Sequence, residues 1–426
     1  MFGGLFGAAV VTIGLTEYRP LLGGVGNLSD CLFLAAFGIW FAVSLLRFDL
    51  TSIEHGWRYA RTVEPLMWAG LLMSAGGAIA SFGSEAPPLS WVMTLKYFLT
   101  FCVWLPWISI ALSRWVSVPT MHILYIVGLA SVALASLTDV AVGTKFGLWL
   151  VSTPQEGVFE NLVQLRYGGP TGHPTTLGYV AAIGFLLSLS YVGGQNSWPR
   201  SLFGACCLVL FGSSLLVSGS RAAFLGIAAG WLVILVRGPR GGLRRLLLLS
   251  TGCLAVLSLI SRAKAMRGFL PVDPLQRLTE SALPRRDFEA DWERRRNLQS
   301  ADLLLARDPV TGYGMENVGT SPAQTLGFNL HNTILQSWLA GGILTCLGAV
   351  WLYATVLAVG WRFVRRDDPL ASALFAACVA FVMMDMVHPH LYMRFKWFSA
   401  ALLLATLNKT SRSSRLKEAD PRDAVN

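Results

Sequence analysis

Apolar segments long enough to cross a lipid bilayer recur along almost the whole chain. A spanning helix needs roughly 20 mostly apolar residues, and a sliding hydropathy window finds about twelve candidates. Hydrophobic residues make up 54% of the chain and charged residues only 14%, a balance that soluble domains do not have. The sequence therefore predicts an all-α fold, a polytopic membrane protein of about 12 transmembrane helices.

The expected spans leave one long polar loop between them. They cover residues 2–16, 28–46, 64–82, 91–112, 121–141, 174–194, 201–218, 222–236, 246–260, 333–358, 369–387 and 392–407. The chain then divides into helices 1–9 over residues 1–260, a partly helical loop over 261–332, helices 10–12 over 333–408 and a polar tail over 409–426. The first span has no Lys or Arg ahead of it, so we expect a retained helix and not a cleaved signal peptide.

Lys and Arg in the short connections indicate the orientation, because basic residues beside a span resist translocation. With a cytoplasmic N-terminus, most of them fall on the cytoplasmic side: Arg47, Arg58, Arg61, Arg114, Arg200, Arg237, Arg240, Arg244, Arg245, Arg362, Arg365, Arg366, Lys409, Arg412, Arg415, Lys417 and Arg422. The outer segments hold fewer, chiefly Arg19, Lys145, Arg166, Arg221, Arg394 and Lys396. We therefore expect both termini in the cytoplasm and the loops at 142–173 and 261–332 outside.

The same arrangement explains the net charge of +10. The arginines lie at membrane boundaries and not on one soluble face, so we expect membrane lipids and no nucleic acid as partners. All seven cysteines fall inside expected spans, which indicates neither a disulfide framework nor a thiolate metal site.

Polar residues gather beside the outer face in four places, and the first is a glycine-rich loop from Arg166 to Pro174. Glycine allows the backbone to approach a ligand closely, and the amide groups at the start of the next helix would suit a phosphate. Arg166 and His173 are therefore candidate substrate-binding residues. An ordinary re-entry turn is the alternative.

The second place is the Ser220-Arg221 turn between the seventh and eighth spans. An arginine this close to hydrocarbon is costly unless it is paired, which makes Arg221 a functional candidate. Small neighbours leave room for a bulky anion. The alternative is an arginine whose side chain reaches the lipid headgroups.

The third place lies in the long loop, where Arg294, Arg295 and Arg296 are consecutive. Carboxylates and arginines spaced four apart around them predict a surface helix lying over the membrane domain. The carboxylates alternate over two helix faces among the arginines, so we expect no metal site there.

The fourth place is the His331-Asn332 pair, just before the tenth span. An imidazole that titrates near neutrality can take a proton from a hydroxyl group, which makes His331 a candidate general base. The alternative is a plain interfacial histidine bonded to a carbonyl. His388 and His390 flank Pro389 in the last outer turn, where we expect turn residues or partners of the site and not a metal.

Together these segments resemble the O-antigen ligase and Wzy polymerase superfamily of bacterial envelope glycosyltransferases. The resemblance covers about residues 150–410. It rests on His331, Asn332, Gly342 and Thr345, on Ser218 to Arg221, on Arg294 with Leu298, on Asp308 to Gly314, and on Gly172-His173-Pro174.

The resemblance implies a glycan donor on undecaprenyl diphosphate and an acceptor hydroxyl on a glycan, a lipid A core or another molecule. It implies a bacterial inner-membrane protein whose active site faces the periplasm. His331 would be the general base, and the diphosphate would bind Arg221, Arg166 and Arg294, with Arg295 or Arg296 as alternatives to Arg294. His173, Asn332 and Ser220 would also bind substrate. No cofactor or metal is expected.

A transporter or flippase for a lipid-linked sugar or another anionic substrate is the main alternative. Against it, the chain shows no symmetry between its halves, and charged residues are scarce in mid-span, Lys96 and Asp385 being the exceptions. Within the enzyme class, these motifs do not separate a ligase from a polysaccharide polymerase, because both reactions release the same diphosphate.

Overall fold

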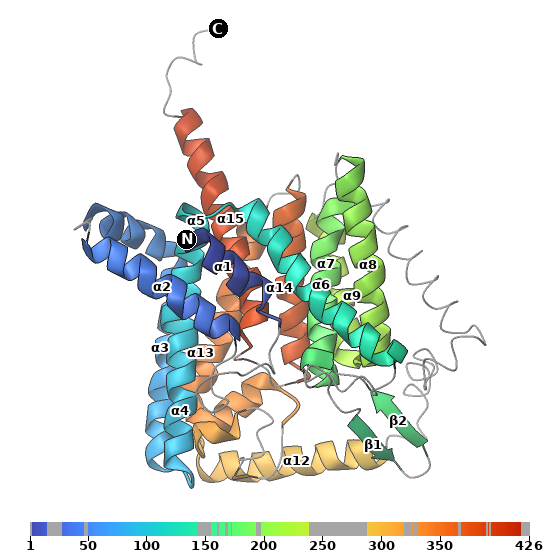
Figure 1. The fold of residues 1–426 in the computed structure, drawn as a ribbon. Coiled ribbons are helices and arrows are strands. Elements are labelled where there is room, and N and C mark those ends of the chain that lie inside the picture. Colours follow the sequence, from blue (N-terminus) through green and yellow to red (C-terminus); the bar gives the residue numbers. More distant parts are fainter. Residues whose placement is uncertain are drawn as a thin grey trace.

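The chain forms a bundle of helices that is crossed at one end by a single helix (Figure 1). The computed structural model describes residues 2–14, 28–46, 50–142, 155–159, 162–166, 169–171, 173–192, 197–237, 288–318, 325–326, 330–364, 368–388, 391 and 393–418. The crossing helix is α12 (Phe288–Arg307), which lies within the long polar loop. The last helix, α15 (Arg394–Glu418), extends away from the opposite end of the bundle.

The remaining helices follow the apolar segments of the sequence. They are α1 (Phe2–Val11), α2 (Leu28–Leu46), α3 (Leu50–Phe82), α4 (Pro87–Phe98), α5 (Leu105–Arg114), α6 (Val118–Val142), α7 (Pro174–Val192), α8 (Trp198–Ser218), α9 (Arg221–Arg237), α13 (Thr333–Phe363) and α14 (Pro369–Asp385). Among the described residues, 6 helical segments are long and apolar enough to cross a membrane, and α2, α9 and α14 contain shorter apolar helices. The chain is therefore a helical membrane protein.

Two expected features fall on residues beyond this description. The span at 246–260 and the first part of the long loop, up to residue 287, lie outside the described residues. The full count of about twelve spans accordingly stays a prediction.

Short elements interrupt the helical pattern. A π-helical segment, Leu99–Trp104, joins α4 to α5 just before Pro106, which has no N–H to donate to the helix. The loop before α7 holds an antiparallel hairpin of β1 (Gln155–Phe159) and β2 (Leu162–Arg166), in which Gln155 pairs with Arg166. This hairpin is a local exception to the expected all-α fold.

Helix α13 is broken at Gly341 and Gly342, which corrects the expectation of one regular span over 333–358. Gly342 has a φ of 69°, in the region that favours glycine, and a Cβ atom there would collide with the Val310 carbonyl oxygen. At the break, a residue from outside the helix accepts the next backbone hydrogen bond: Ile343 N–H donates to the Val310 carbonyl at 3.2 Å. The break is therefore filled by another segment of the chain.

That segment is the loop Asp308–Gly314, which follows α12. Tyr313 N–H donates to the Leu339 carbonyl and Gly314 N–H to the Ala340 carbonyl, each at 2.9 Å. Positive φ angles of 77° at Gly312 and 106° at Gly314 let the loop run this close to α13. Two motifs that were separate in the sequence thus form one unit.

Helix α3 packs against the same break. A Cβ atom on Gly76 would lie 2.6 Å from the Gly341 carbonyl oxygen, so only glycine allows the two helices to approach this closely. Thr345 Oγ1 lies within hydrogen-bond distance of two backbone carbonyl oxygens, that of Met73 at 3.1 Å and that of Gly341 at 2.8 Å. The motif glycines and Thr345 therefore hold the backbone of α13, and none of them needs to touch a ligand to explain its place.

Helix α7 is the central helix of the bundle. Of its spanning window, 83% is buried inside the protein, against 44% to 56% for the other five long segments. The polar side chains of α7 from Thr175 to Ser188, Tyr179 among them, are buried inside the protein and consequently do not face lipid.

Candidate functional site

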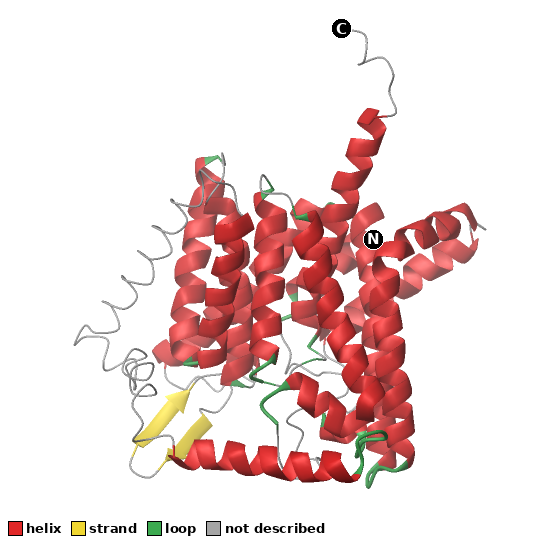
Figure 2. Ribbon diagram, turned by 180° about the vertical axis from the view of Figure 1, so that it is seen from behind, coloured by secondary structure: helices red, strands yellow, loops and turns green. Residues whose placement is uncertain are grey.

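The polar segments singled out in the sequence lie at the same end of the bundle. Helix α12, the β1–β2 hairpin and the beginning of α7 share this end, which Figure 2 shows from behind. The start of α13 and the turn between α8 and α9 face it as well. Loops far apart in the chain are therefore near one another in space.

Three histidines from separate segments meet there. His173 precedes α7, His331 precedes α13 and His388 follows α14. The ring centroid of His388 lies 5.6 Å from that of His331 and 5.7 Å from that of His173, both in edge-to-face arrangements. His388, interpreted from the sequence as a turn residue or a partner of the site, is thus the middle member of this histidine cluster.

His173 is fixed by the start of α7. Its Nδ1 accepts a hydrogen bond from Thr175 N–H at 3.1 Å, and its carbonyl accepts one from Thr171 Oγ1 at 3.0 Å. A ring nitrogen that accepts must be unprotonated, so the proton of neutral His173 is on Nε2. The imidazole therefore caps one of the backbone N–H groups in the first turn of α7, which have no hydrogen-bond partner within the helix.

His331 is exposed, and the residues on either side of it are anchored. Leu330 N–H donates to Gln336 Oε1 at 2.7 Å, and Gln336 in turn donates to the Asn317 carbonyl. Asn332 is the N-cap of α13, where its side-chain oxygen accepts from Leu335 N–H at 3.0 Å. The predicted substrate contact of Asn332 is untested, but its capping role alone explains an asparagine here.

The Ser220-Arg221 turn is packed against α7. Gly219 ends α8 with a φ of 55°, and Ser220 N–H lies 3.3 Å from Ser218 Oγ. Ser220 is buried, and a Cβ atom added to Gly178 would lie 2.5 Å from the Ser220 Cβ. Arg221 begins α9 and is exposed. Ser220 therefore supports the turn, while Arg221 is the residue of this motif that a ligand can reach.

Helix α12 carries the arginines of the third motif. Arg295 and Arg296 are exposed, whereas the side chain of Arg294, like that of Arg166 at the end of β2, lies outside the described residues. Further along, α12 is anchored because Ala301 packs with Leu330 and Leu339 in a small buried cluster. The arginine helix and the segment before His331 are thereby fixed to each other.

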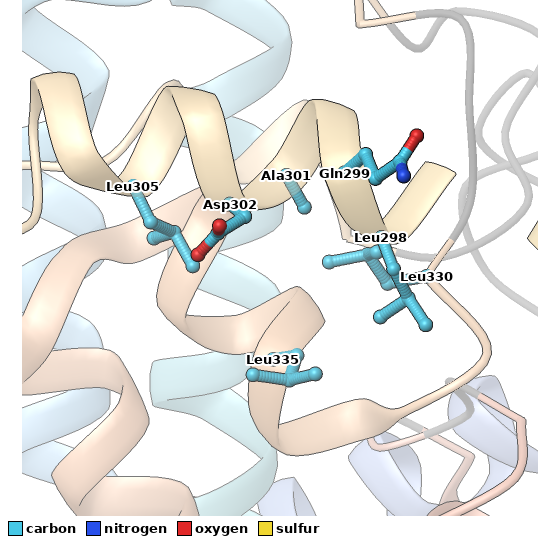
Figure 3. A pocket seen from close by; sticks show the side chains of 7 residues that line it. All are labelled: Leu298, Gln299, Ala301, Asp302, Leu305, Leu330 and Leu335. Atoms are coloured by element: carbon cyan, nitrogen blue, oxygen red, sulfur yellow. The ribbon is translucent and has the colours of Figure 1, made fainter. Parts of the chain in front are cut away.

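A groove of about 350 Å³ lies between α12 and the start of α13 (Figure 3). Most of its lining is apolar, and Gln299 and Asp302 are the polar exceptions. The lining residues are Leu298, Gln299, Ala301, Asp302, Leu305, Leu330 and Leu335. One lining residue, Leu330, directly precedes the candidate general base His331 in the sequence.

The loop that fills the break in α13 begins with a charged turn. Asp308 accepts hydrogen bonds from Thr311 N–H at 3.0 Å and from Val310 N–H at 3.2 Å, and Thr311 Oγ1 also donates to it. The hydroxyl and the backbone N–H of Thr311 lower the pKa of the Asp308 carboxyl below its ordinary value. Asp308 is therefore an ionised turn residue that orders this loop.

A buried polar network that the sequence did not predict lies directly behind the histidine cluster. Lys396, which we expected in an outer segment, is fully buried in an ion pair with Asp385, and the hydroxyl groups of Tyr179 and Tyr353 donate to the same carboxylate. Arg394 likewise pairs with Asp30 of α2. An acidic residue inside an apolar span was the available signal, because such residues are rare in membranes and need partners.

The site thus combines an exposed imidazole, two neighbouring imidazoles and exposed arginines on adjoining elements. Among the described residues, no group of three or more His, Cys, Asp or Glu side chains is placed to hold a metal ion. Such a set can take a proton from a hydroxyl group and bind an anion. Compared with known proteins, the chain matches no family model and no curated protein.

Proposed function

We propose that this protein is a membrane glycosyltransferase that moves a glycan from undecaprenyl diphosphate to an acceptor hydroxyl on the periplasmic side of a bacterial inner membrane. The observation that carries the proposal is the meeting of His331 with His173 and His388 at the end of the bundle that also holds α12 and the Arg221 turn. A general base suits a hydroxyl acceptor, several cations suit a diphosphate, and an apolar groove suits a lipid.

In this reaction the acceptor oxygen attacks the anomeric carbon of the donor sugar. His331 takes the acceptor proton as the new carbon–oxygen bond forms, and the bond from that carbon to the diphosphate breaks. The lipid diphosphate leaves with the bonding electrons, and Arg221 with an arginine of α12 stabilises its developing charge. A single displacement of this kind inverts the anomeric carbon.

The test is transfer by the purified protein in detergent, with an undecaprenyl diphosphate glycan and a candidate acceptor. We expect His331→Ala and Arg221→Ala to remove at least about a hundredfold of the activity, the scale of a lost general base or charge-stabilising donor. Arg200→Ala is the matched control, because Arg200 is also an exposed arginine in the first turn of a helix, α8.

Detergent removes the closed compartment that transport requires, so product formation there separates an enzyme from a flippase. Wild-type rates in both His331→Ala and Arg221→Ala would refute the site assignment. The acceptor that becomes glycosylated decides between a ligase and a polysaccharide polymerase.

A further inference from the structure

The buried network behind the histidine cluster is centred on Asp385, the last residue of α14. Asp385 and Lys396 are both fully buried, and the Lys396 ammonium contacts one carboxylate oxygen. Tyr353 donates to that oxygen at 2.5 Å, and Tyr179 donates to the other at 3.0 Å. The network therefore joins α7, α13, α14 and α15 around one carboxylate.

The ammonium group is enclosed by aromatic rings as well. Lys396 Nζ lies 5.7 Å from the ring centroid of Tyr179 and 5.8 Å from those of Phe381 and Trp397. Ring faces attract a cation within about 6 Å, so the charge is held by more than its ion pair.

A buried ion pair is not an effective way to stabilise a fold. The cost of removing two charges from water often exceeds their mutual attraction, and apolar replacements of both are frequently as stable. Buried polar networks instead define one arrangement of the elements that they join. The location of this network therefore matters more than its contribution to stability.

The network reaches the histidine cluster through the His388 carbonyl. Tyr179 Oη lies 3.2 Å from this oxygen, and Thr333 Oγ1 donates to it at 3.3 Å. Each histidine of the cluster also adjoins a helix of the network: His173 precedes α7, His331 precedes α13 and His388 follows α14. The three imidazoles therefore lie beside helices that the network joins.

We propose that Tyr179, Asp385 and Lys396 are positioning residues that hold His388, and through it set the orientation of His331 and His173. Tyr179 is the link, because its hydroxyl touches both Asp385 and the His388 carbonyl. The catalytic meaning of this arrangement rests on the proposed function. The positioning itself does not, and it can be measured without any substrate.

The direct test is the NMR spectrum of ¹⁵N-histidine-labelled protein in detergent, which contains only 6 histidines. Each ring signal is assigned by replacing one histidine at a time with glutamine. We expect Tyr179→Phe to shift the ring signals of His388 and of at least one of its two neighbours. We expect Tyr353→Phe, which loses a bond to Asp385 but leaves the Tyr179 hydroxyl beside the His388 carbonyl, to shift them less.

The matched control is Tyr191→Phe on the same helix. The Tyr191 hydroxyl lies 2.9 Å from Nδ1 of His122, so this variant should move the His122 signal and leave the cluster unchanged. The proposal is wrong if Tyr179→Phe leaves all three cluster signals in place, or if Tyr191→Phe moves them equally.

Transfer kinetics then separate this proposal from the function. With active wild-type protein, Tyr179→Phe should lower kcat by roughly ten- to a hundredfold, the scale of a misplaced catalytic group, with KM changed far less. Absence of transfer in the wild type would overturn the proposed function while the NMR result still decides the positioning role. Unchanged kcat in Tyr179→Phe would overturn the catalytic meaning of the positioning and leave the proposed function standing.

Discussion

At the scale of single residues, several motif positions have structural duties that a sequence pattern cannot distinguish from ligand contacts. Asn332 caps α13, Ser220 fills a space left by Gly178, and Thr345 bonds the backbone at the break. His331 and Arg221 differ from them because both are exposed. Exposure is what allows a ligand to reach these two residues.

Replacing Asn332 tests this distinction. Asn332→Ala removes the cap and should lower the free energy of unfolding by about 1 kcal/mol, whereas Asn332→Asp keeps an accepting oxygen and should lower it far less. Thermal unfolding in detergent measures both variants. If the side-chain amide also binds substrate, Asn332→Asp should fold normally and still raise KM for the donor. Wild-type stability of Asn332→Ala would show that the cap contributes nothing.

At the scale of elements, hydropathy predicts where helices lie but not where they break. The spans at 174–194, 201–218 and 222–236 agree with α7, α8 and α9 to within a few residues, because apolar length is a property of the local sequence. The residues around Gly341 and Gly342 are equally apolar. Only the approach of the Asp308–Gly314 loop explains why α13 is interrupted, and that contact is absent from any local window.

Gly342→Ala should be strongly destabilising for the same reason. Alanine is strained at a φ of 69°, which costs about 1–3 kcal/mol, and its Cβ would also collide with the Val310 carbonyl oxygen. The control is Gly38→Ala in α2, where a Cβ would meet nothing within 4 Å and a helical alanine is favoured by up to about 1 kcal/mol. In a thermal-shift measurement, Gly342→Ala should lower the midpoint of unfolding and Gly38→Ala should raise it. Equal midpoints for the two variants would mean that the Asp308–Gly314 loop moves aside for the new Cβ atom without any loss of stability.

At the scale of the whole molecule, the histidine cluster exists only because four helices converge. Each histidine was visible in the sequence, and topology rules predicted that their loops share a face. Their contact, and the fully buried state of Lys396, depend on how α7, α13, α14 and α15 pack. A lysine near the end of a span has the same sequence signature whether it reaches the headgroups or, as here, an aspartate inside the bundle.

Charge balance inside the bundle can therefore be tested with paired substitutions. Lys396→Met alone leaves the Asp385 carboxylate buried without its cation and should cost about 3–5 kcal/mol of unfolding free energy. Adding Asp385→Asn removes the second charge and keeps one oxygen that can accept from one tyrosine hydroxyl, while the new amide group can donate to the hydroxyl oxygen of the other tyrosine, so the double variant should regain much of that loss. Thermal unfolding of both proteins in the same detergent provides the comparison. A double variant no more stable than Lys396→Met would mean that the ion pair itself, and not the uncompensated charge, determines the stability of this region.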